Sequence, residues 1–215
     1  MIDTLRKSVI AGMFIALGCM VNLKVGGYFG AFLFSFGLLS VVLYGVPLYT
    51  GKAGFCKTGN DVKRLPAIFC GNIIGTSLLA VCAYFCFPDM SEKAKAIVRA
   101  RVDAPVYTAF FASFLCGFVM TTIVRFARKQ EHDKMQKDKD VQTHEPRNLI
   151  ILLVGIPLFI LSGYWHSIAD AFYYVCSMDY SLWMFLVYPV TVLGNYVGCN
   201  AYNLIARGSL FCDGD

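Results

Sequence analysis

Long apolar runs separated by short polar joints dominate this sequence of 215 residues. A helix needs roughly 20 apolar residues to cross a hydrocarbon core of about 30 Å. Six windows meet or nearly meet this requirement, so we predict an all-α integral membrane protein with six transmembrane helices in a single domain, residues 1–215. The windows are Leu5–Leu23, Phe29–Phe55, Leu65–Phe87, Ala104–Ala127, Leu149–Tyr174 and Leu182–Ala206.

The two halves of the chain share short motifs. PAIFCGNIIG at residues 66–75 matches PVTVLGNYVG at 189–198, and a similar offset relates GVPL at 45–48 to GYWH at 163–166. Each half holds three spans, an odd number, so the second copy must be inverted in the membrane. We therefore expect an inverted 3+3 repeat, about 5–87 and 104–207, which is typical of transport proteins.

Glycine and proline interrupt the second and fifth windows. Proline removes a backbone donor and glycine relaxes the backbone. Non-helical backbone at membrane depth is tolerated only where protein buries it or water reaches it, so paired interruptions indicate a solute site. The interruptions fall at Gly45, Pro47, Gly51 and Gly54 and at Gly155, Pro157 and Gly163.

Polar residues accompany both interruptions: Thr50 and Lys52 in the first, and His166, Ser167 and Asp170 in the second. His166 and Asp170 are four residues apart, hence on one face of a helix, and ionisable residues within membranes usually face a cavity or a partner. We expect His166 to face a pore; the alternative is a neutral core histidine bonded to a carbonyl. Asp170 could instead cap a helix or pair with His166.

Composition and charge agree with a membrane location. Hydrophobic residues make up 57% of the chain and charged residues 15%, against about 25% charged in soluble domains, and the mean hydropathy is +0.59. The net charge of +5 lies in the joints between apolar runs, so no nucleic-acid partner is indicated. Seven cysteines lie within apolar runs without metal-ligand spacing and are interpreted as small packing residues.

Basic residues gather in the joints on one side of the predicted membrane. With the N-terminus inside, the inner joints carry thirteen lysine or arginine residues and the outer joints carry five. We expect a multi-pass protein of the cell (inner) membrane with both termini cytoplasmic and a cytoplasmic linker at 125–147. The outer residues are Lys24, Lys93, Lys95, Arg99 and Arg101. The inner residues are Arg6, Lys7, Lys57, Lys63, Arg64 and Arg207, with seven more in the linker.

The interrupted segments GVPLYTGK (45–52) and GYWHSIAD (163–170) resemble two elements of the formate/nitrite transporter family, G-x-E-L-[FY]-T-G and G-F-E-H-S-x-A-N. The paired GNxxG motifs are similar to that family's as well. The resemblance implies an aquaporin-like protomer with the second and fifth helices broken, a homopentamer with one pore per protomer, and transport of small monovalent anions such as formate, nitrite, hydrosulfide, acetate and lactate. It implies no cofactor, no metal and no catalytic residue.

The resemblance also assigns pore residues. Thr50 would face His166 across the pore. Arg99 or Arg101, of which the spacing favours Arg101, would form an outer cationic funnel for anions. Asp170 and the amides Asn72 and Asn195 would join the pore and substrate-binding set. The expected constrictions are formed by Leu38 and Leu48 on the inner side and by Phe34 and Phe159 on the outer side, and Tyr49 is a further constriction residue.

Several positions depart from the family pattern. Pro47 and Trp165 replace two glutamates, while Asp170 and Gly117 replace two asparagines. An ionised Asp170 facing the pore would repel an anion, which makes neutral or protonated solutes more plausible.

The expected mechanism is passage of the neutral acid: Arg101 attracts the anion, and His166 with Thr50 supplies hydrogen bonds or a proton. The main alternative is an aquaporin-like channel for neutral solutes. A membrane enzyme using His166 and Asp170 lacks an accompanying nucleophile, metal cluster or cofactor motif. The apolar composition also permits a non-transporting membrane scaffold, but the paired helix breaks do not require it.

Overall fold

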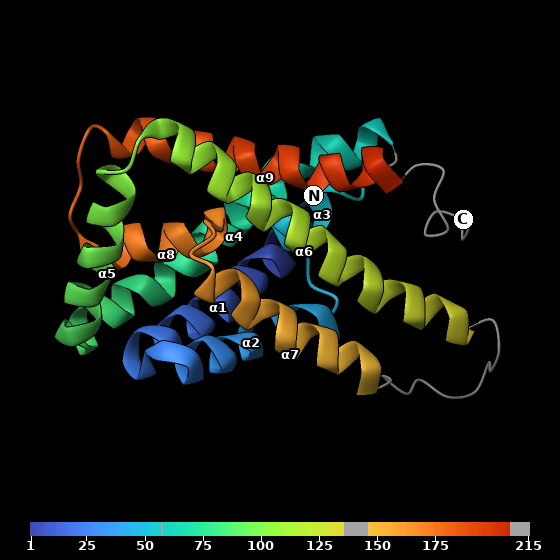
Figure 1. Cartoon of the computed structure of the whole chain (residues 1–215), viewed down its shortest axis with the longest axis horizontal. Coiled ribbons are helices and arrows are strands. Elements are labelled where there is room, and N and C mark those ends of the chain that lie inside the picture. The colour runs from blue at the N-terminus through green and yellow to red at the C-terminus, as the bar shows by residue number, and fades with distance from the viewer. Residues whose placement is uncertain (57, 136–145, 207–215) are drawn as a thin grey trace.

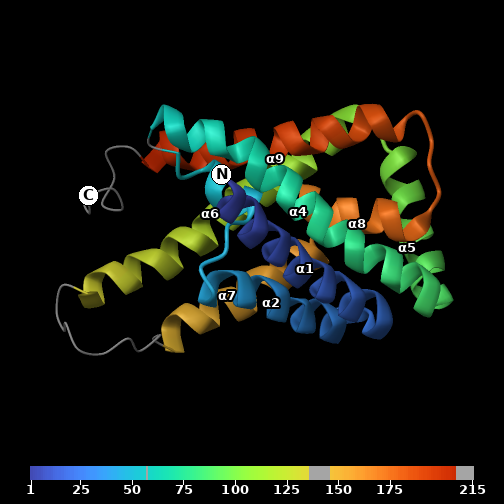
Figure 2. The same cartoon turned by 180° about the vertical axis from the view of Figure 1, so that it is seen from behind.

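The computed structural model describes residues 1–56, 58–135 and 146–206, and every element in these ranges is a helix (Figures 1 and 2). The helices, in chain order, are α1 (Ile2–Val25), α2 (Gly27–Leu43), α3 (Tyr49–Ala53), α4 (Gly59–Cys86), α5 (Pro88–Val102), α6 (Val106–Met135), α7 (Pro146–Leu161), α8 (Ser167–Ser177) and α9 (Met184–Ala206). Lys57, Arg207 and residues 136–145 of the expected linker lie outside the described residues.

The second and fifth windows do not form single long spans. Within the described residues, three segments are long and apolar enough to cross a membrane: Ile2–Val25, Gly59–Cys86 and Val106–Phe126. Gly27–Leu43 and Ile150–Leu161 are apolar but shorter. Each of these shorter helices is followed by a non-helical segment and then by a short helix, α3 or α8, so the two predicted interruptions are real breaks.

The breaks occupy residues 44–48 and 162–166, and each contains a glycine in the left-handed region: Gly45 at φ 62° and Gly163 at φ 71°. The interruptions expected at Gly155 and Pro157 are not found, because α7 continues through both to Leu161. Neighbouring helices can compensate the backbone bond that a proline removes within a membrane helix. Pro47 does lie in a break.

Glycines of the GNxxG motifs bring helices into direct backbone contact. α1 packs on α4, and α6 packs on α9. A Cβ atom added to Gly75 would collide with the carbonyl oxygen of Val9, and one added to Gly198 would collide with that of Phe114. Small residues allow this close approach between membrane helices. The same close packing explains the glycine at position 117, since a Cβ atom on Gly117 would collide with the carbonyl oxygen of Asn195.

The joint between the third and fourth windows, expected only as a polar connection, forms helix α5. Pro88 occupies its first turn, where the missing N–H costs no helical bond. Arg99 and Arg101 lie in its last turn, where cations complement the helix dipole.

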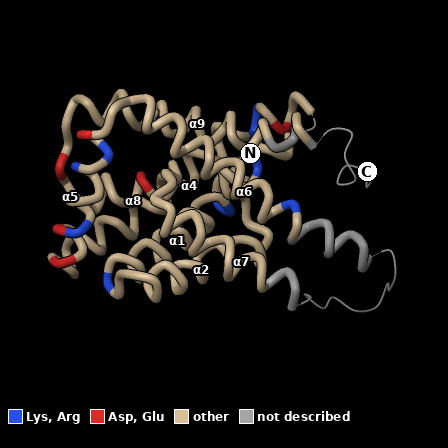
Figure 3. Tube along the Cα trace, in the orientation of Figure 1, with Lys and Arg blue, Asp and Glu red and all other residues tan. Residues whose placement is uncertain are grey.

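The molecule has two distinct ends. The first residue, the end of α6, the start of α7 and the end of α9 lie on one side, called the N-terminal end below, while α5 lies at the opposite side, the α5 end (Figures 1 and 2). Charged positions lie toward both ends, and most of the bundle between them is uncharged (Figure 3).

Candidate pore site

The two helix breaks meet at a hydrogen bond between Thr50 and His166. Thr50 lies in α3, and His166 immediately precedes α8. The Thr50 Oγ1 to His166 Nε2 distance is 2.8 Å, and both side chains are buried. The structure thus joins two residues 116 positions apart, one from each half of the chain.

The His166 ring caps the N-terminus of α8. Its Nδ1 accepts a hydrogen bond from the backbone N–H of Ala169 at 3.3 Å. An acceptor nitrogen carries no proton, so the ring hydrogen of the neutral imidazole lies on Nε2 and points to Thr50. The hydroxyl hydrogen of Thr50 then remains available for another acceptor. The bonding of His166 to a backbone carbonyl, considered above as an alternative, is not what the structure shows.

Asn72 holds the first break in place. Its Oδ1 accepts from the backbone N–H of Tyr49 at 2.8 Å, and its Nδ2 donates to the carbonyl oxygens of Ser8 at 2.8 Å and Pro47 at 3.1 Å. The side chain is fully buried. We call this arrangement an amide clasp, because one side chain joins both sides of Leu48 to α1.

Asn195 forms the same clasp around the second break. Its Oδ1 accepts from the backbone N–H of Ser167, and its Nδ2 donates to the carbonyl oxygens of Trp165 and Ser113, each at 2.8 Å. This asparagine is also fully buried. Both amides, expected as pore-lining groups, make their described hydrogen bonds to backbone.

Phe159 lies beside His166 in a buried apolar core that also contains Phe34, Leu38 and Leu48. The Phe34 and Phe159 rings meet edge to face with centroids 5.9 Å apart, and the Phe159 centroid lies 5.9 Å from that of His166. Leu38 and Leu48 are buried in the same core. Tyr49 lies elsewhere: its ring packs on Phe69 of α4 and lines a groove of about 380 Å³ with residues of α9.

Asp170 pairs with Arg101 rather than with His166. Asp170 Oδ1 lies 3.2 Å from Arg101 Nη2, and the two side chains are 1% and 15% exposed. The guanidinium carbon of Arg101 lies 4.3 Å from the Trp165 ring centroid, which is a cation–π contact. Arg101 is therefore largely buried and already paired, whereas the expected funnel requires a cation that is open to solution. Asp170 does not present an uncompensated charge to the pore either.

The other basic residues of the α5 end are also engaged. The Lys24 ammonium lies 3.0 Å from Asp89 and holds the pKa of that carboxyl below its ordinary value. A hydrogen bond to Glu92 raises the pKa of Lys95 in the same way. The remaining contacts are Lys93 Nζ to the Leu23 carbonyl oxygen at 2.7 Å and Arg99 Nε to Asp179 at 3.2 Å.

Cys199 has a role that sequence reasoning did not identify. Its Sγ lies 3.4 Å from the carbonyl oxygens of both Thr50 and Gly117, so it links α9 to α3 and α6. The cysteine directly follows the GNxxG motif of the sixth window, and that adjacency was the only available signal.

Comparison with known proteins identifies the family. The sequence model described as "Formate/nitrite transporter" matches residues 1–205. The nitrite transporter NirC of Escherichia coli K12 is 23% identical over 185 residues, covering 76% of this chain and 64% of that protein. The formate channel FocA of Haemophilus influenzae is 23% identical over 154 residues, covering 66% and 51%. These alignments span less than two thirds of the relatives' length.

Solved structures share the fold over nearly the whole chain. A pentameric formate channel with formate bound superposes with a TM-score of 0.79 at 16% identity, covering 97% of this chain and 96% of that one. An FNT family ion channel gives a TM-score of 0.76 at 19% identity, covering 96% and 88%. Together with the family match, the apolar helices and paired breaks establish the class of membrane protein. The chain belongs to the formate/nitrite transporter family.

Proposed function

We propose that this protein is a membrane channel or transporter for small monovalent anions of the formate, nitrite, hydrosulfide and acetate class, which cross with a proton as the neutral acid. The observation that carries the proposal is the Thr50–His166 hydrogen bond, formed where two broken helices meet inside an apolar enclosure. Relatives named as a nitrite transporter and a formate channel support the substrate class.

The apolar enclosure favours a neutral permeant. Moving a bare anion into a low-dielectric medium costs on the order of 20 kcal/mol in the ideal case, and several kcal/mol after relaxation. The side chains of Phe34, Phe159, Leu38 and Leu48 offer no hydrogen bonds to offset that cost. Protonation of the solute removes most of it, so the conducted species is the acid.

His166 acts in this scheme as a hydrogen-bond donor rather than as the source of the proton. Protonation of Nδ1 would direct its N–H at the N–H of Ala169 and break the cap of α8. Loss of the Nε2 proton would leave an anionic ring in an apolar site. The proton therefore enters with the solute from the aqueous side, and uptake rises as the external solution becomes more acidic.

The two amide clasps support an inverted repeat. Asn72 and Asn195 bond equivalent backbone atoms around Leu48 and His166 and tie them to equivalent helices, α1 and α6. We propose on this basis that the two halves form an inverted repeat. The excess of basic residues in the inner joints supports cytoplasmic termini in a cell (inner) membrane. The shared fold with a pentameric formate channel supports a homopentamer with one pore in each protomer.

Proteoliposomes containing the purified protein test the proposal. Uptake of formate, nitrite, hydrosulfide and acetate is measured after a step of the outside pH from neutral to acidic. Saturable uptake that increases at acidic pH is expected, with protein-free liposomes as the control for passive diffusion of the acid. Absence of protein-dependent uptake for all four anions would overturn it.

The pairing of Arg101 with Asp170 favours a second candidate, an aquaporin-like channel for small neutral solutes. Because Arg101 is already neutralised, it adds no charge preference for an anion at the α5 end. Rapid osmotic swelling of the proteoliposomes in glycerol or urea, without anion uptake, would identify this activity.

A further inference from the structure

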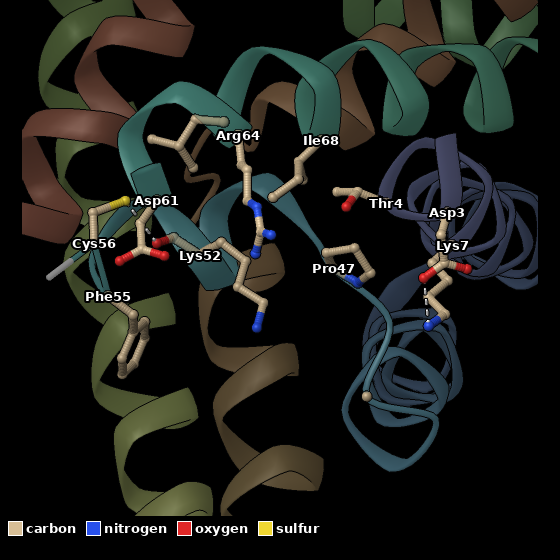
Figure 4. A pocket seen from close by; sticks show the side chains of 12 residues that line it. Asp3, Thr4, Lys7, Pro47, Lys52, Phe55, Cys56, Asp61, Arg64 and Ile68 are labelled. Atoms are coloured by element: carbon tan, nitrogen blue, oxygen red, sulfur yellow. Dashed lines mark hydrogen bonds and ion pairs between the residues drawn. The ribbon is translucent and has the colours of Figure 1, made fainter. Parts of the chain in front are cut away.

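Helix α3, which carries Thr50, is too short to fix its own position. It has five residues, Tyr49–Ala53, whereas α8 beside His166 has eleven. A helix of this length gains most of its stability from packing and from bonds to other elements. On one flank, Lys52 and Cys56 line a cavity of about 310 Å³, so this side of α3 and of the chain after it is not solidly packed (Figure 4). The position of α3 therefore depends on its hydrogen bonds to neighbouring helices.

Two consecutive residues of α9 bind the carbonyl end of α3. The Cys199 Sγ lies 3.4 Å from the Thr50 carbonyl oxygen, and the Asn200 Nδ2 lies 3.3 Å from the Ala53 carbonyl oxygen. The last four carbonyl oxygens of a helix have no partner within that helix, and in α3 these run from Thr50 to Ala53. The side chains of α9 thus supply partners for the first and the last of these oxygens.

The chain directly after α3 also lies close to α6 and α9. A Cβ atom added to Gly54 would lie 2.9 Å from the Thr121 hydroxyl oxygen and 3.0 Å from the Cys199 carbonyl oxygen. The Cys199 Sγ is also 3.4 Å from the carbonyl oxygen of Gly117 in α6. The end of α3 is therefore seated on the backbone of α9, at the residue whose side chain contacts Thr50.

The residues that follow the two GNxxG motifs differ in their contacts. Thr76 and Ser77 follow the first motif, and Cys199 and Asn200 follow the second. The Thr76 hydroxyl bonds the carbonyl oxygens three and four residues earlier in its own helix, each at 3.0 Å. The side chains after the second motif instead reach across to α3. Thr76 is therefore a matched control for Cys199, because both are fully buried and occupy the same place in the motif.

We propose that Cys199 and Asn200 are positioning residues, which hold α3 by its carbonyl end and thereby determine the selection of solutes by size at Thr50 and His166. The inference rests on the proposed function and deepens it. The carbonyl and the hydroxyl belong to one residue, so a shift of the Thr50 carbonyl also moves its hydroxyl relative to His166. A fixed apolar site discriminates against one added methylene by roughly 10-fold to 200-fold, and a wall that yields loses part of this discrimination.

The ratio of formate flux to acetate flux tests the proposal in proteoliposomes. Acetate is larger than formate by a methyl group, and both fluxes are measured on one preparation after subtraction of the flux into protein-free liposomes. The ratio does not depend on how much of the protein is folded, so a purely structural loss leaves it unchanged. Cys199→Ala should lower the ratio about threefold to tenfold. Asn200→Ala should lower it less, and Thr76→Ala should leave it unchanged.

Cys199→Ser distinguishes hydrogen bonding from packing. A serine hydroxyl remains a donor to the Thr50 carbonyl, so this variant should keep most of the wild-type ratio. An equal fall in Cys199→Ser and Cys199→Ala would assign the effect to side-chain volume and overturn the proposal. An unchanged ratio in Cys199→Ala, or an equal fall in Thr76→Ala, would overturn it as well.

The ring of His166 gives a readout that does not require transport. Its Nε2 lies 2.8 Å from the Thr50 Oγ1, and the NMR chemical shift of the Nε2 proton falls as this hydrogen bond lengthens. The chain contains three histidines, so loss of the signal in His166→Gln assigns it. The signal should move to lower chemical shift in Cys199→Ala and stay in place in Thr76→Ala.

The two failures are distinguishable. If the wild type carries no anion but the His166 signal moves in Cys199→Ala, the positioning of Thr50 stands and the proposed anion transport is wrong. If the wild type carries formate and neither the flux ratio nor the His166 signal responds to Cys199→Ala, the transport proposal stands and the positioning role is wrong.

Discussion

The two helix breaks have the same scaffold and different chemistry. Each is fixed by a buried asparagine that makes one bond to a backbone N–H and two to carbonyl oxygens. The first break presents Leu48 at the position where the second presents His166, and Lys52 aligns with Asp170. The two breaks therefore share a hydrogen-bonding arrangement of the backbone but carry different side chains.

The largest expected effect is loss of a clasp. Asn72→Ala and Asn195→Ala should each destabilise the protein by on the order of 5 kcal/mol, because three buried backbone groups lose a partner at about 1–3 kcal/mol each. Thermal unfolding in detergent measures this, with Ser40→Ala as a control that removes only a bond within one helix. If one asparagine proved dispensable, the two scaffolds would not be equivalent.

A smaller loss is expected at the ion pair between Asp170 and Arg101, beside the second break. Asp170→Asn or Arg101→Gln should cost roughly 3 kcal/mol, since removing one partner leaves a buried charge without compensation. The double variant should recover part of that loss. Unfolding measurements over this double-mutant cycle would refute a coupled pair if the two single effects simply added.

Replacements of His166 distinguish hydrogen bonding from proton donation. His166→Phe should reduce formate flux about tenfold, the factor that corresponds to losing roughly 1.4 kcal/mol of hydrogen bonding. His166→Gln keeps an N–H donor without an acid–base group, so flux and its rise at acidic pH should largely persist. Flux in His166→Gln that no longer responds to pH would show that the imidazole itself supplies the proton.

The smallest effect concerns the exposed pair of Lys24 and Asp89 at the α5 end. Because Lys24 lowers the pKa of Asp89 in the folded protein, the pair stabilises the fold above the ordinary carboxyl pKa of 3.8. This contribution disappears as the pH falls through the lower folded-state value. Thermal unfolding between pH 6 and about 2.5 should therefore show slightly less acid sensitivity in Lys24→Gln than in the wild type. A steeper loss in the variant would contradict the sign.

The sequence was sufficient for features that depend on local pattern. Apolar windows coincide with the three helices that are long and apolar enough to cross a membrane. Gly45 and Gly163 marked both breaks, because a left-handed backbone favours glycine. Family membership, inferred from the motifs around Thr50 and His166, is confirmed by the match over residues 1–205. Helix α5 was missed because a charged amphipathic segment resembles a solvated loop when only membrane spans are sought.

The contacts within the site were harder to predict from the sequence, because they join residues far apart in the chain. Nothing in the local sequence indicates that Arg101 would pair with Asp170 and stack on Trp165. The hydrogen-bonding partners of Asn72 and Asn195 were equally hidden, although the motif containing them was recognised. Pro157 misled the interpretation because a proline signals the loss of one bond and does not reveal whether neighbouring helices compensate for it.

The amide clasps also bear on how this protein can evolve. Asn72 and Asn195 contact the carbonyl oxygens of Pro47 and Trp165, which are backbone atoms that every amino acid offers. The side chains at those two positions can therefore change without disturbing the hydrogen bonds of the clasp. In this chain, Pro47 and Trp165 occupy positions where the family pattern has glutamates. A substitution at Pro47 or Trp165 can therefore alter the chemistry of a break while the asparagine keeps its backbone in place.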